Sequence, residues 1–359
     1  MLLSGLRRRR FLLLAAPALA LLLGALAATT RSCGKAGGGI WPPDWRSPTL
    51  SEVVSSLNIQ NAVVYAVSAD GTIYALSLPT GKVIWQQPFA MPSTAPPLIK
   101  YGLVFVGSNE PAFCAFDALK GAPAWKLRAA GPVSQAAAFD KGRIFFADDL
   151  GLMTAAEAVS GKVIWRTQLE GPLSAPCIVG ERVCVATPGR LYCLLESTGE
   201  LLWSLKTGSS SLSSPAGEGG TVFIGAGEGQ LLAVRASDGS RLWSVRLGGD
   251  VVGGPWLQGG KAFVAAGGRV LCLGKDDGHV LWKTMVKGTI TTPAGADGRH
   301  VFVATDRGIV YVLDAGNGRR VWRRKGEETI SGRIVAEDGS LLFGTWGREI
   351  RAVPLPGGL

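Results

Sequence analysis

The sequence of 359 residues is short of charged side chains and of histidine, and these shortages disfavour several kinds of active site. Charged residues make up 18% of the chain, and the two histidines are His279 and His300. Neither has a neighbouring acid and nucleophile that the sequence could place beside it, so a hydrolase triad is not expected. Both are predicted to be surface turn residues. Cysteine and histidine spacings typical of a metal site are absent as well.

Basic residues are concentrated at the N-terminus. The net charge is +10, and the first 33 residues contain five arginines and no acidic residue, which leaves +5 for the rest of the chain. These arginines are Arg7, Arg8, Arg9, Arg10 and Arg31. No basic run interleaved with aromatic side chains remains after residue 33. Nucleic acid is therefore not an expected partner.

An export signal is predicted over residues 1–33. Arg7–Arg10 precede an apolar run from Phe11 to Ala28, which is the order of the charged and apolar regions of a signal peptide. The alternative is an uncleaved inner-membrane anchor over residues 11–28, because a run of about 18 residues is barely long enough to span a bilayer.

Two finer features of this segment stay open on the sequence. Arg8-Arg9-Arg10-Phe11-Leu12 resembles the core of a twin-arginine signal but lacks the usual flanking Ser/Thr and Lys, and arginines serve any signal peptide. Cys33 follows the apolar run and precedes a glycine-rich tether over residues 34–40, which resembles the lipid-attachment site of a bacterial lipoprotein. Thr30 and Arg31 depart from that pattern. Cys33 is thus either a lipid anchor or a stray cysteine near a cleavage site.

One short pattern recurs along the rest of the chain: a small residue, a glycine six positions later and a tryptophan four positions after that. Successive tryptophans are separated by 40, 40, 38, 40, 39 and 40 residues, a regularity typical of a repeat architecture. The tryptophans are Trp85, Trp125, Trp165, Trp203, Trp243, Trp282 and Trp322. The glycines are Gly81, Gly121, Gly161, Gly199, Gly239, Gly278 and Gly318.

Each repeat predicts four short strands with no helix between them. In the unit that ends near Trp243, they cover Leu212–Gly217, Thr221–Gly225, Gln230–Val234 and Ser240–Val245, separated by Gly, Asp and Ser turns. Four strands in about forty residues are the signature of a β-propeller blade.

The count of blades depends on the two ends of the chain. After Trp322 three more strands are predicted, and the outer strand of that last unit is missing. The three cover Ile330–Glu337, Leu341–Trp346 and Glu349–Pro354. A spare tryptophan segment, Gly37–Trp45, precedes the first complete unit and can supply the missing strand, which would leave no open sheet edge. We therefore predict an all-β fold over residues 41–359: an eight-bladed propeller of four-stranded antiparallel blades, closed by its N-terminal strand.

The repeat pattern itself predicts structural roles. In five of the seven copies the glycine follows Thr, Ser or Asp, in a tight turn that is expected to require positive φ. The tryptophan is expected to pack on the neighbouring blade, with its indole N–H bonded to a backbone acceptor. The fullest copy, Ala75-Leu76-Ser77-Leu78-Pro79-Thr80-Gly81-Lys82-Val83-Ile84-Trp85, resembles the tryptophan-docking repeat of pyrroloquinoline-quinone (PQQ)-like propellers, and the resemblance covers roughly residues 41–359.

Among proteins with this repeat, short eight-bladed chains with an export signal resemble the BamB-type lipoproteins of outer-membrane assembly. The resemblance implies a non-catalytic periplasmic scaffold without a cofactor, whose protein partners belong to the β-barrel assembly machinery. The first alternative is a small quinoprotein oxidoreductase that binds PQQ and calcium in the funnel. Longer quinoprotein dehydrogenases carry an adjacent cysteine pair and large insertions, and this chain has neither. The second alternative is a sensor ectodomain anchored through residues 11–28.

The cysteines after residue 33 are odd in number, so they cannot all pair. They are Cys114, Cys177, Cys184, Cys193 and Cys272. Cys193 and Cys272 occupy the small-residue position and are expected to be buried. A turn at Gly180-Glu181 would place Cys177 opposite Cys184 at a hydrogen-bonded site, where Cβ atoms lie further apart than a disulfide favours.

Four other features are given structural interpretations. The paired acids Asp148-Asp149 and Asp276-Asp277 are expected to be solvated in turns rather than to bind a cation. Trp256 and Trp346 lie outside the repeat register and are expected to be packing or rim aromatics rather than the floor of a site.

Overall fold

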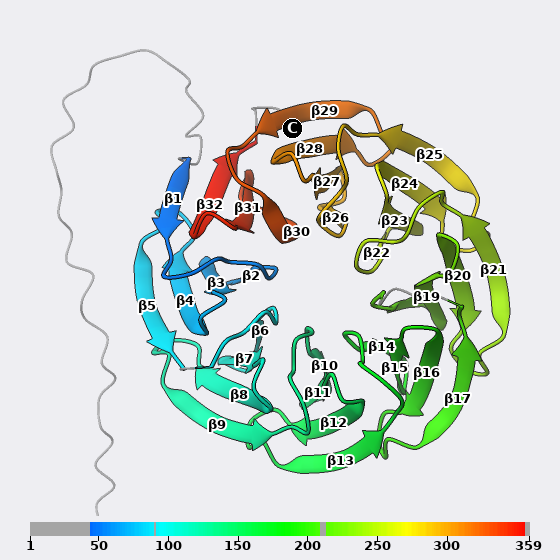
Figure 1. Cartoon of the computed structure of the whole chain (residues 1–359), viewed down its shortest axis with the longest axis horizontal. Coiled ribbons are helices and arrows are strands. Elements are labelled where there is room, and N and C mark those ends of the chain that lie inside the picture. Colours follow the sequence, from blue (N-terminus) through cyan, green and yellow to red (C-terminus); the bar gives the residue numbers. More distant parts are fainter. Residues whose placement is uncertain (1–43, 90, 209–212, 356–359) are drawn as a thin grey trace, which may run out of the picture. The chain divides into compact units, whose positions relative to one another are not determined.

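A computed structural model describes residues 44–89, 91–208 and 213–355. Within these ranges the chain forms eight four-stranded antiparallel sheets and no helix (Figure 1). The sheets are the blades of a closed ring, which confirms the predicted eight-bladed propeller. The same ranges contain no helix with the length and apolar character needed to cross a bilayer. The predicted export signal, the alternative anchor over residues 11–28, Cys33 and the tether lie outside the described residues.

Seven blades follow one another along the chain, and the eighth combines its two ends. Blades 1 to 4 consist of β2 (Asn58–Gln60), β3 (Val63–Val67), β4 (Thr72–Ser77) and β5 (Val83–Pro88); β6 (Leu98–Lys100), β7 (Leu103–Gly107), β8 (Ala112–Asp117) and β9 (Pro123–Arg128); β10 (Ala138–Asp140), β11 (Arg143–Ala147), β12 (Leu152–Glu157) and β13 (Val163–Gln168); and β14 (Cys177–Val179), β15 (Arg182–Thr187), β16 (Arg190–Leu195) and β17 (Leu201–Lys206). Blades 5 to 8 consist of β18 (Ala216–Glu218), β19 (Thr221–Ala226), β20 (Gln230–Arg235) and β21 (Arg241–Arg246); β22 (Trp256–Gln258), β23 (Lys261–Ala266), β24 (Arg269–Gly274) and β25 (Val280–Met285); β26 (Gly295–Ala296), β27 (His300–Ala304), β28 (Ile309–Asp314) and β29 (Arg320–Lys325); and β30 (Ile330–Glu337), β31 (Ser340–Thr345), β32 (Glu349–Pro354) and β1 (Trp45–Pro48).

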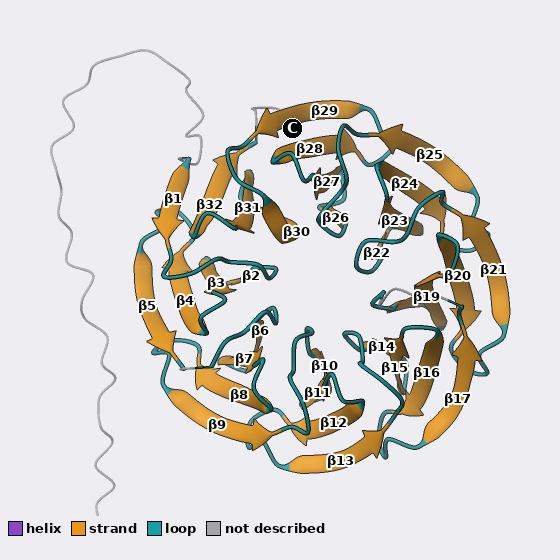
Figure 2. Ribbon diagram, in the orientation of Figure 1, coloured by secondary structure: helices purple, strands orange, loops and turns teal. Residues whose placement is uncertain are grey.

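The position of a strand in its blade determines its burial. First strands surround the central opening and fourth strands form the rim (Figure 2). The second and third strands, such as β3 and β4, are buried on both faces between adjacent blades and are accordingly almost wholly apolar. The rim strand β5 alternates between exposed and half-buried residues, because only one of its faces packs on the ring.

Blade 5 shows how closely the repeat pattern locates the strands. Three of its strands, β19 to β21, agree with the prediction to within one residue at each end. The innermost strand differs: β18 begins at Ala216 and ends at Glu218, whereas Leu212–Gly217 was expected. Since β18 pairs with β19 alone, only the residues next to the hairpin turn form a ladder.

Ring closure by the N-terminal strand is confirmed. β1 pairs antiparallel with β32, and Trp45 lies opposite Ala352. The other blades have the same pairing of a tryptophan with a small residue, followed by a shift of register in the third strand. Trp45 therefore occupies in blade 8 the position of the seven repeat tryptophans. A small partner leaves room for the indole to lie across the strand.

Replacing Trp45 should open the ring. We expect Trp45→Ala to lower the free energy of unfolding by about 3–5 kcal/mol, because a buried aromatic side chain is lost where the two ends of the chain meet. Trp346→Ala is the control, since 56% of Trp346 is exposed against 8% of Trp45. Urea unfolding of the two variants measures the difference. Equal losses would contradict closure through β1.

Candidate functional site

The junctions between blades share one hydrogen bond. Seven indole N–H groups each donate to the carbonyl oxygen of the residue that follows the third strand of the next blade, at 2.9–3.1 Å. The pairs are Trp45–Leu78, Trp85–Ala118, Trp125–Ala158, Trp165–Glu196, Trp203–Ala236, Trp243–Lys275 and Trp282–Ala315. Trp322 packs against the buried cluster that contains Val353 and Leu355 of blade 8. Seven of the eight junctions thus join two blades through one indole and one carbonyl oxygen, and Trp322 joins blades 7 and 8 by packing.

The turn glycines lie directly under these indoles. All seven have φ between 66° and 75°. A Cβ atom added to any of them would lie 2.5–2.8 Å from an indole carbon of the preceding blade, as for Gly121 and Trp85. Each glycine is therefore required both by its positive φ and by the close contact with the indole, whereas the sequence predicted only the requirement of the turn. These positions are occupied by the scaffold and leave no group free for chemistry.

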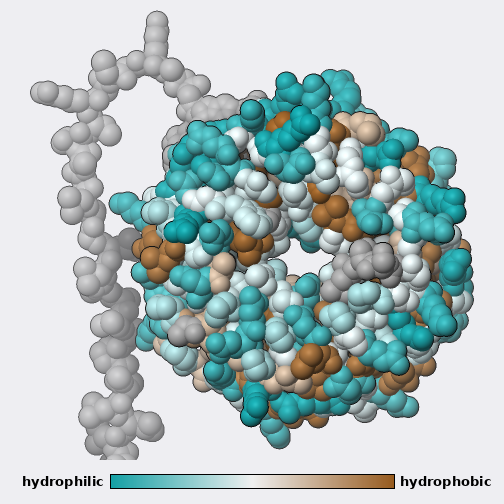
Figure 3. All heavy atoms as spheres, in the orientation of Figure 1, coloured by the Kyte–Doolittle hydropathy of each residue, from teal (hydrophilic) through white to brown (hydrophobic). Residues whose placement is uncertain are grey.

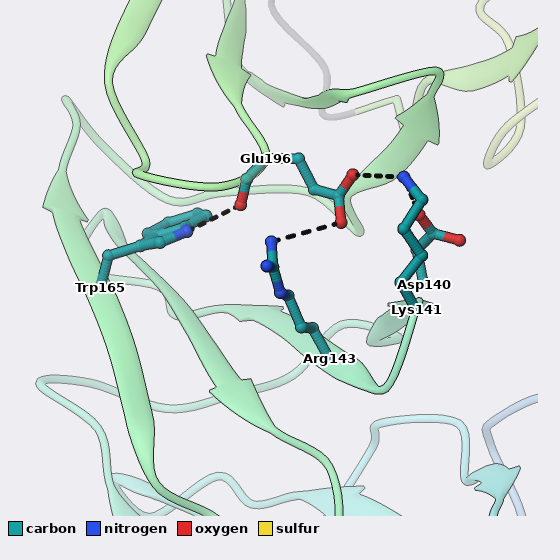
Figure 4. Close-up of polar contacts among 5 residues, drawn as sticks. All are labelled: Asp140, Lys141, Arg143, Trp165 and Glu196. Carbon is teal, nitrogen blue, oxygen red and sulfur yellow. Dashed lines mark hydrogen bonds and ion pairs between the residues drawn. The ribbon is translucent and has the colours of Figure 1, made fainter.

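A buried carboxylate distinguishes the junction between blades 3 and 4 (Figure 4). Glu196 accepts the Trp165 bond with its backbone oxygen, and its side chain, 4% exposed, faces two cations of blade 3. Lys141 Nζ lies 3.2 Å and Arg143 Nη1 3.7 Å from its carboxylate oxygens. Hydrogen bonds to Asp140 and then Glu196 raise the pKa of Lys141. The sequence analysis missed this cluster. The one feature of the sequence that could have indicated it is an acid, Glu196, at a position where four other repeats have Ala.

Removal of this carboxylate should destabilise the ring. We expect Glu196→Ala to lower the free energy of unfolding by about 1–3 kcal/mol, because Arg143 loses its partner at the junction. In the control Glu228→Ala, the lost ion pair with Arg246 joins side chains that are 72% and 76% exposed, and the change should stay below about 0.5 kcal/mol. Thermal unfolding at low and high salt measures both. A larger loss for the control would contradict the structural role of Glu196.

Three thiols form a row across blade 4. Cys177 lies opposite Cys184 as predicted, and Cys184 lies opposite Cys193. All three are free thiols, as are Cys114 and Cys272. The Sγ atoms of Cys184 and Cys193 are 3.0 Å apart. Hydrogen bonds to Cys177 and Cys193, together with burial, raise the pKa of Cys184 well above its usual range.

The rate at which each of the cysteines Cys114, Cys177 and Cys272 is alkylated should depend on the exposure of its thiol and on its pKa. Burial raises the pKa of Cys114 and Cys272 to about 11, so at pH 8 about a thousandth of each is thiolate. Cys177, which is half-buried, should react first with iodoacetamide in the folded protein. Mass spectrometry of labelled peptides measures the order, with urea-unfolded protein as the control. Labelling of Cys272 as fast as Cys177 would contradict this order.

Two sequence interpretations are wrong. His300 was expected at the surface but is only 7% exposed. It is the first residue of β27, the second strand of its blade, and therefore lies between blades. The Nδ1 atom of His300 is 3.4 Å from Asp297 Oδ2. Asp148 was expected to be solvated but is 1% exposed. Its carboxylate accepts four backbone N–H groups, those of Ala130, Gly131, Leu150 and Leu152, and so caps a turn. His279 is exposed in its turn as expected.

Two of the innermost strands, β30 and β22, are connected by an arginine stacked on a tryptophan. The face shown in Figure 3 mixes hydrophilic and apolar residues around the central opening. Arg333 of β30 places its guanidinium 4.9 Å from the ring centroid of Trp256 on β22, and Nη2 donates to Gly254 O at 3.2 Å. Burial lowers the pKa of Arg333 to about 10. Trp256 is thus a packing aromatic in contact with a cation, while Trp346 is exposed between β31 and β32.

The described residues do not offer a metal site. Across residues 44–355, apart from the undescribed positions, no group of three or more His, Cys, Asp or Glu side chains is arranged to hold a metal ion. The acids Asp148 and Asp277 are bonded to backbone N–H groups of their own turns. Both acids are therefore engaged in the structure of their turns.

A family profile matches nearly the whole propeller. It is the profile described as outer membrane protein assembly factor BamB, and it matches residues 27–137, 128–250, 189–282 and 247–354. No protein in the curated set matches the sequence.

Solved structures share the fold at low sequence identity. BamB from Moraxella catarrhalis has a TM-score of 0.72 at 16% identity, covering 85% of this chain and 98% of its own. The computationally designed Ika8 protein has a TM-score of 0.78 at 17% identity, covering 86% and 98%. A quinohemoprotein alcohol dehydrogenase from Pseudomonas putida has a TM-score of 0.70 at 12% identity, covering 88% and 76%. These likenesses establish the ring architecture alone.

Proposed function

The chain belongs to the family of the outer membrane protein assembly factor BamB, and on that premise we propose that it is a non-catalytic scaffold for outer-membrane β-barrel assembly. The observation that carries the proposal is the family match over residues 27–354, made to a ring without large insertions. Strands within a blade are joined by two to five residues, and consecutive blades by no more than nine. Such a ring offers short loops for protein partners of the assembly machinery rather than an enclosed substrate chamber.

The enzymatic alternative finds little support in the side chains of this chain. A quinoprotein dehydrogenase would need ligands for calcium and a surface for PQQ in the funnel. The described acids lack the clustering that a metal requires, and no two cysteines are adjacent in the sequence. The aromatic face of Trp256, a candidate surface for PQQ, is already in contact with Arg333. We therefore derive no catalytic step for this protein.

Location in the periplasm follows from the same proposal. The arginines before the apolar run would direct export, and Cys33 would be acylated to hold the propeller on the outer membrane by its glycine-rich tether. The competing proposal keeps residues 11–28 as an inner-membrane anchor for a sensor ectodomain.

A single substitution separates these two anchors. Expressed as the full chain in its own bacterium, the unchanged protein should incorporate palmitate and fractionate with the outer membrane, and Cys33→Ser should lose both properties, because the acylated thiol is gone. Cys177→Ser is the control and should stay with the membrane. Absence of palmitate from the unchanged chain, together with its location in the inner membrane, would contradict the lipid anchor and favour the anchor over residues 11–28.

The scaffold role is tested by partner capture and by cofactor titration. Affinity purification of the tagged full chain after crosslinking in the cell envelope should recover subunits of the β-barrel assembly machinery, and deletion of the gene should reduce outer-membrane barrel proteins. PQQ with calcium chloride should leave the thermal midpoint unchanged, whereas a ligand at a hundredfold excess over Kd stabilises by about 2.7 kcal/mol. A saturable rise of the midpoint accompanied by dye reduction with alcohols would overturn the proposal.

A further inference from the structure

The junction between blades 6 and 7 resembles the junction between blades 3 and 4 but keeps only one of its three paired charges. Gly259 stands where blade 3 has Lys141. Trp282 donates to Ala315 O at 3.1 Å, so Ala315 occupies the position that Glu196 has in blade 4. Lys261 begins the second strand of blade 6, just as Arg143 begins that of blade 3. The cation is therefore retained at the second junction, and the carboxylate that faces it at the first is replaced by a methyl group.

This change leaves an open crevice. A cavity of about 470 Å³ lies at the junction of blades 6 and 7, and we name it the Lys261 crevice. Its lining includes Gln258, Lys261, Phe263, Arg299, His300 and Ala315. Lys261 Nζ has only the carbonyl oxygen of Ala315 at 3.5 Å, and no ion pair to Lys261 exists among the described residues.

Two acids lie at the crevice, Asp314 in its lining and Asp297 beside His300, and both accept hydrogen bonds from their own turns. Asp314 Oδ1 accepts the backbone N–H groups of Gly316 and Asn317 at 2.8 and 2.9 Å. Asp297 Oδ1 accepts two backbone N–H groups of its own turn, and its Oδ2 lies beside His300 Nδ1. Arg299 on the wall of the crevice is exposed. The crevice is therefore lined by two cations, Lys261 and Arg299, and by the carboxylate of Asp314, which forms no ion pair with either of them among the described residues.

A third junction shows that the residue that accepts the indole bond can be either the acidic or the basic member of an ion pair. Between blades 5 and 6, the residue that accepts the indole bond is a cation, Lys275, and its Nζ lies 2.6 Å from Glu218 Oε2. Junctions 3–4 and 5–6 thus contain a completed ion pair at this position, while junction 6–7 contains only the cation. Coulomb attraction in a partly buried crevice favours an anion there.

We propose that the Lys261 crevice binds a carboxylate group, which takes the place that the Glu196 side chain has between blades 3 and 4. The group is either a free small carboxylate or an acidic side chain of a partner protein, since both present the same anion. The inference rests on the comparison of junctions and not on the proposed scaffold role.

Two probes distinguish these sources. Glutarate and the blocked peptide acetyl-Gly-Glu-Gly-amide are titrated separately into the ¹⁵N-labelled protein and followed by NMR, with glutaramide and the Gln peptide as neutral counterparts. Saturable shifts centred on the amides of Gln258 and Ala315 are expected with the charged probes only. Shifts with glutarate and the peptide support a site for any carboxylate, and shifts with the peptide alone support an acidic side chain. No saturable shift with either charged probe, or equal shifts with the neutral ones, would overturn the proposal.

Variants connect the binding to the crevice. Lys261→Met should weaken binding by about tenfold or more, since it removes a charge-assisted hydrogen bond. Lys162→Met, which replaces an exposed lysine in a turn of blade 3, should leave binding unchanged. Ala315→Glu supplies the missing carboxylate from within the chain; it should abolish binding and raise the thermal midpoint above that of Ala315→Gln. Unchanged binding in both Lys261→Met and Ala315→Glu would overturn the assignment.

Discussion

The indole of each docked tryptophan lies on a glycine of the next blade and donates its N–H to a carbonyl beside that glycine, as Trp85 does to Ala118 above Gly121. The ring depends on this contact, because a blade of four short strands cannot bury its own faces. In an open array of repeats, each unit is stabilised only by its neighbours and the terminal units are weak. Here Trp45 repeats the contact between the last blade and the first, so no blade is terminal.

The same contact determines which side chains can differ from one blade to the next. The small residue, the glycine and the tryptophan are occupied by docking in blades 1 to 7. The residue whose carbonyl accepts the indole bond contributes only its backbone, so its side chain is free to differ. It is Glu196 at one junction, Lys275 at another and Ala315 at a third. Specific features of this propeller therefore lie in the crevices between blades and in the short loops.

Much of the fold could be predicted because the same pattern of residues recurs every 38 to 40 positions along the chain. The spacing of small residue, glycine and tryptophan predicted the blade count, the strand positions and the closure by the N-terminal strand. The hairpin at Gly180-Glu181 predicted the register that places Cys177 opposite Cys184. Each of these inferences needs only residues that are close in sequence or repeat at a fixed distance.

Features that depend on contacts across junctions could not be predicted in this way. Glu196 meets Lys141 from the preceding repeat, and Arg333 reaches Trp256 from two blades away. Asp148 looked like a solvated turn acid, yet four backbone N–H groups converge on it once the neighbouring segment packs there. A repeat pattern specifies the docking residues but gives no information about the side chains that vary between copies. The contacts of these varying side chains are visible only in the folded ring.

Hydrogen exchange of the indole N–H groups, followed by NMR, tests the docking contact most directly. The seven bonded indoles should exchange slowly and at a common rate set by opening of the whole ring, with Trp45 as well protected as Trp165, while the exposed Trp346 exchanges fast. Exchange of Trp45 at the rate of Trp346, or a separate rate for each blade, would contradict a ring that is closed and held together by these contacts.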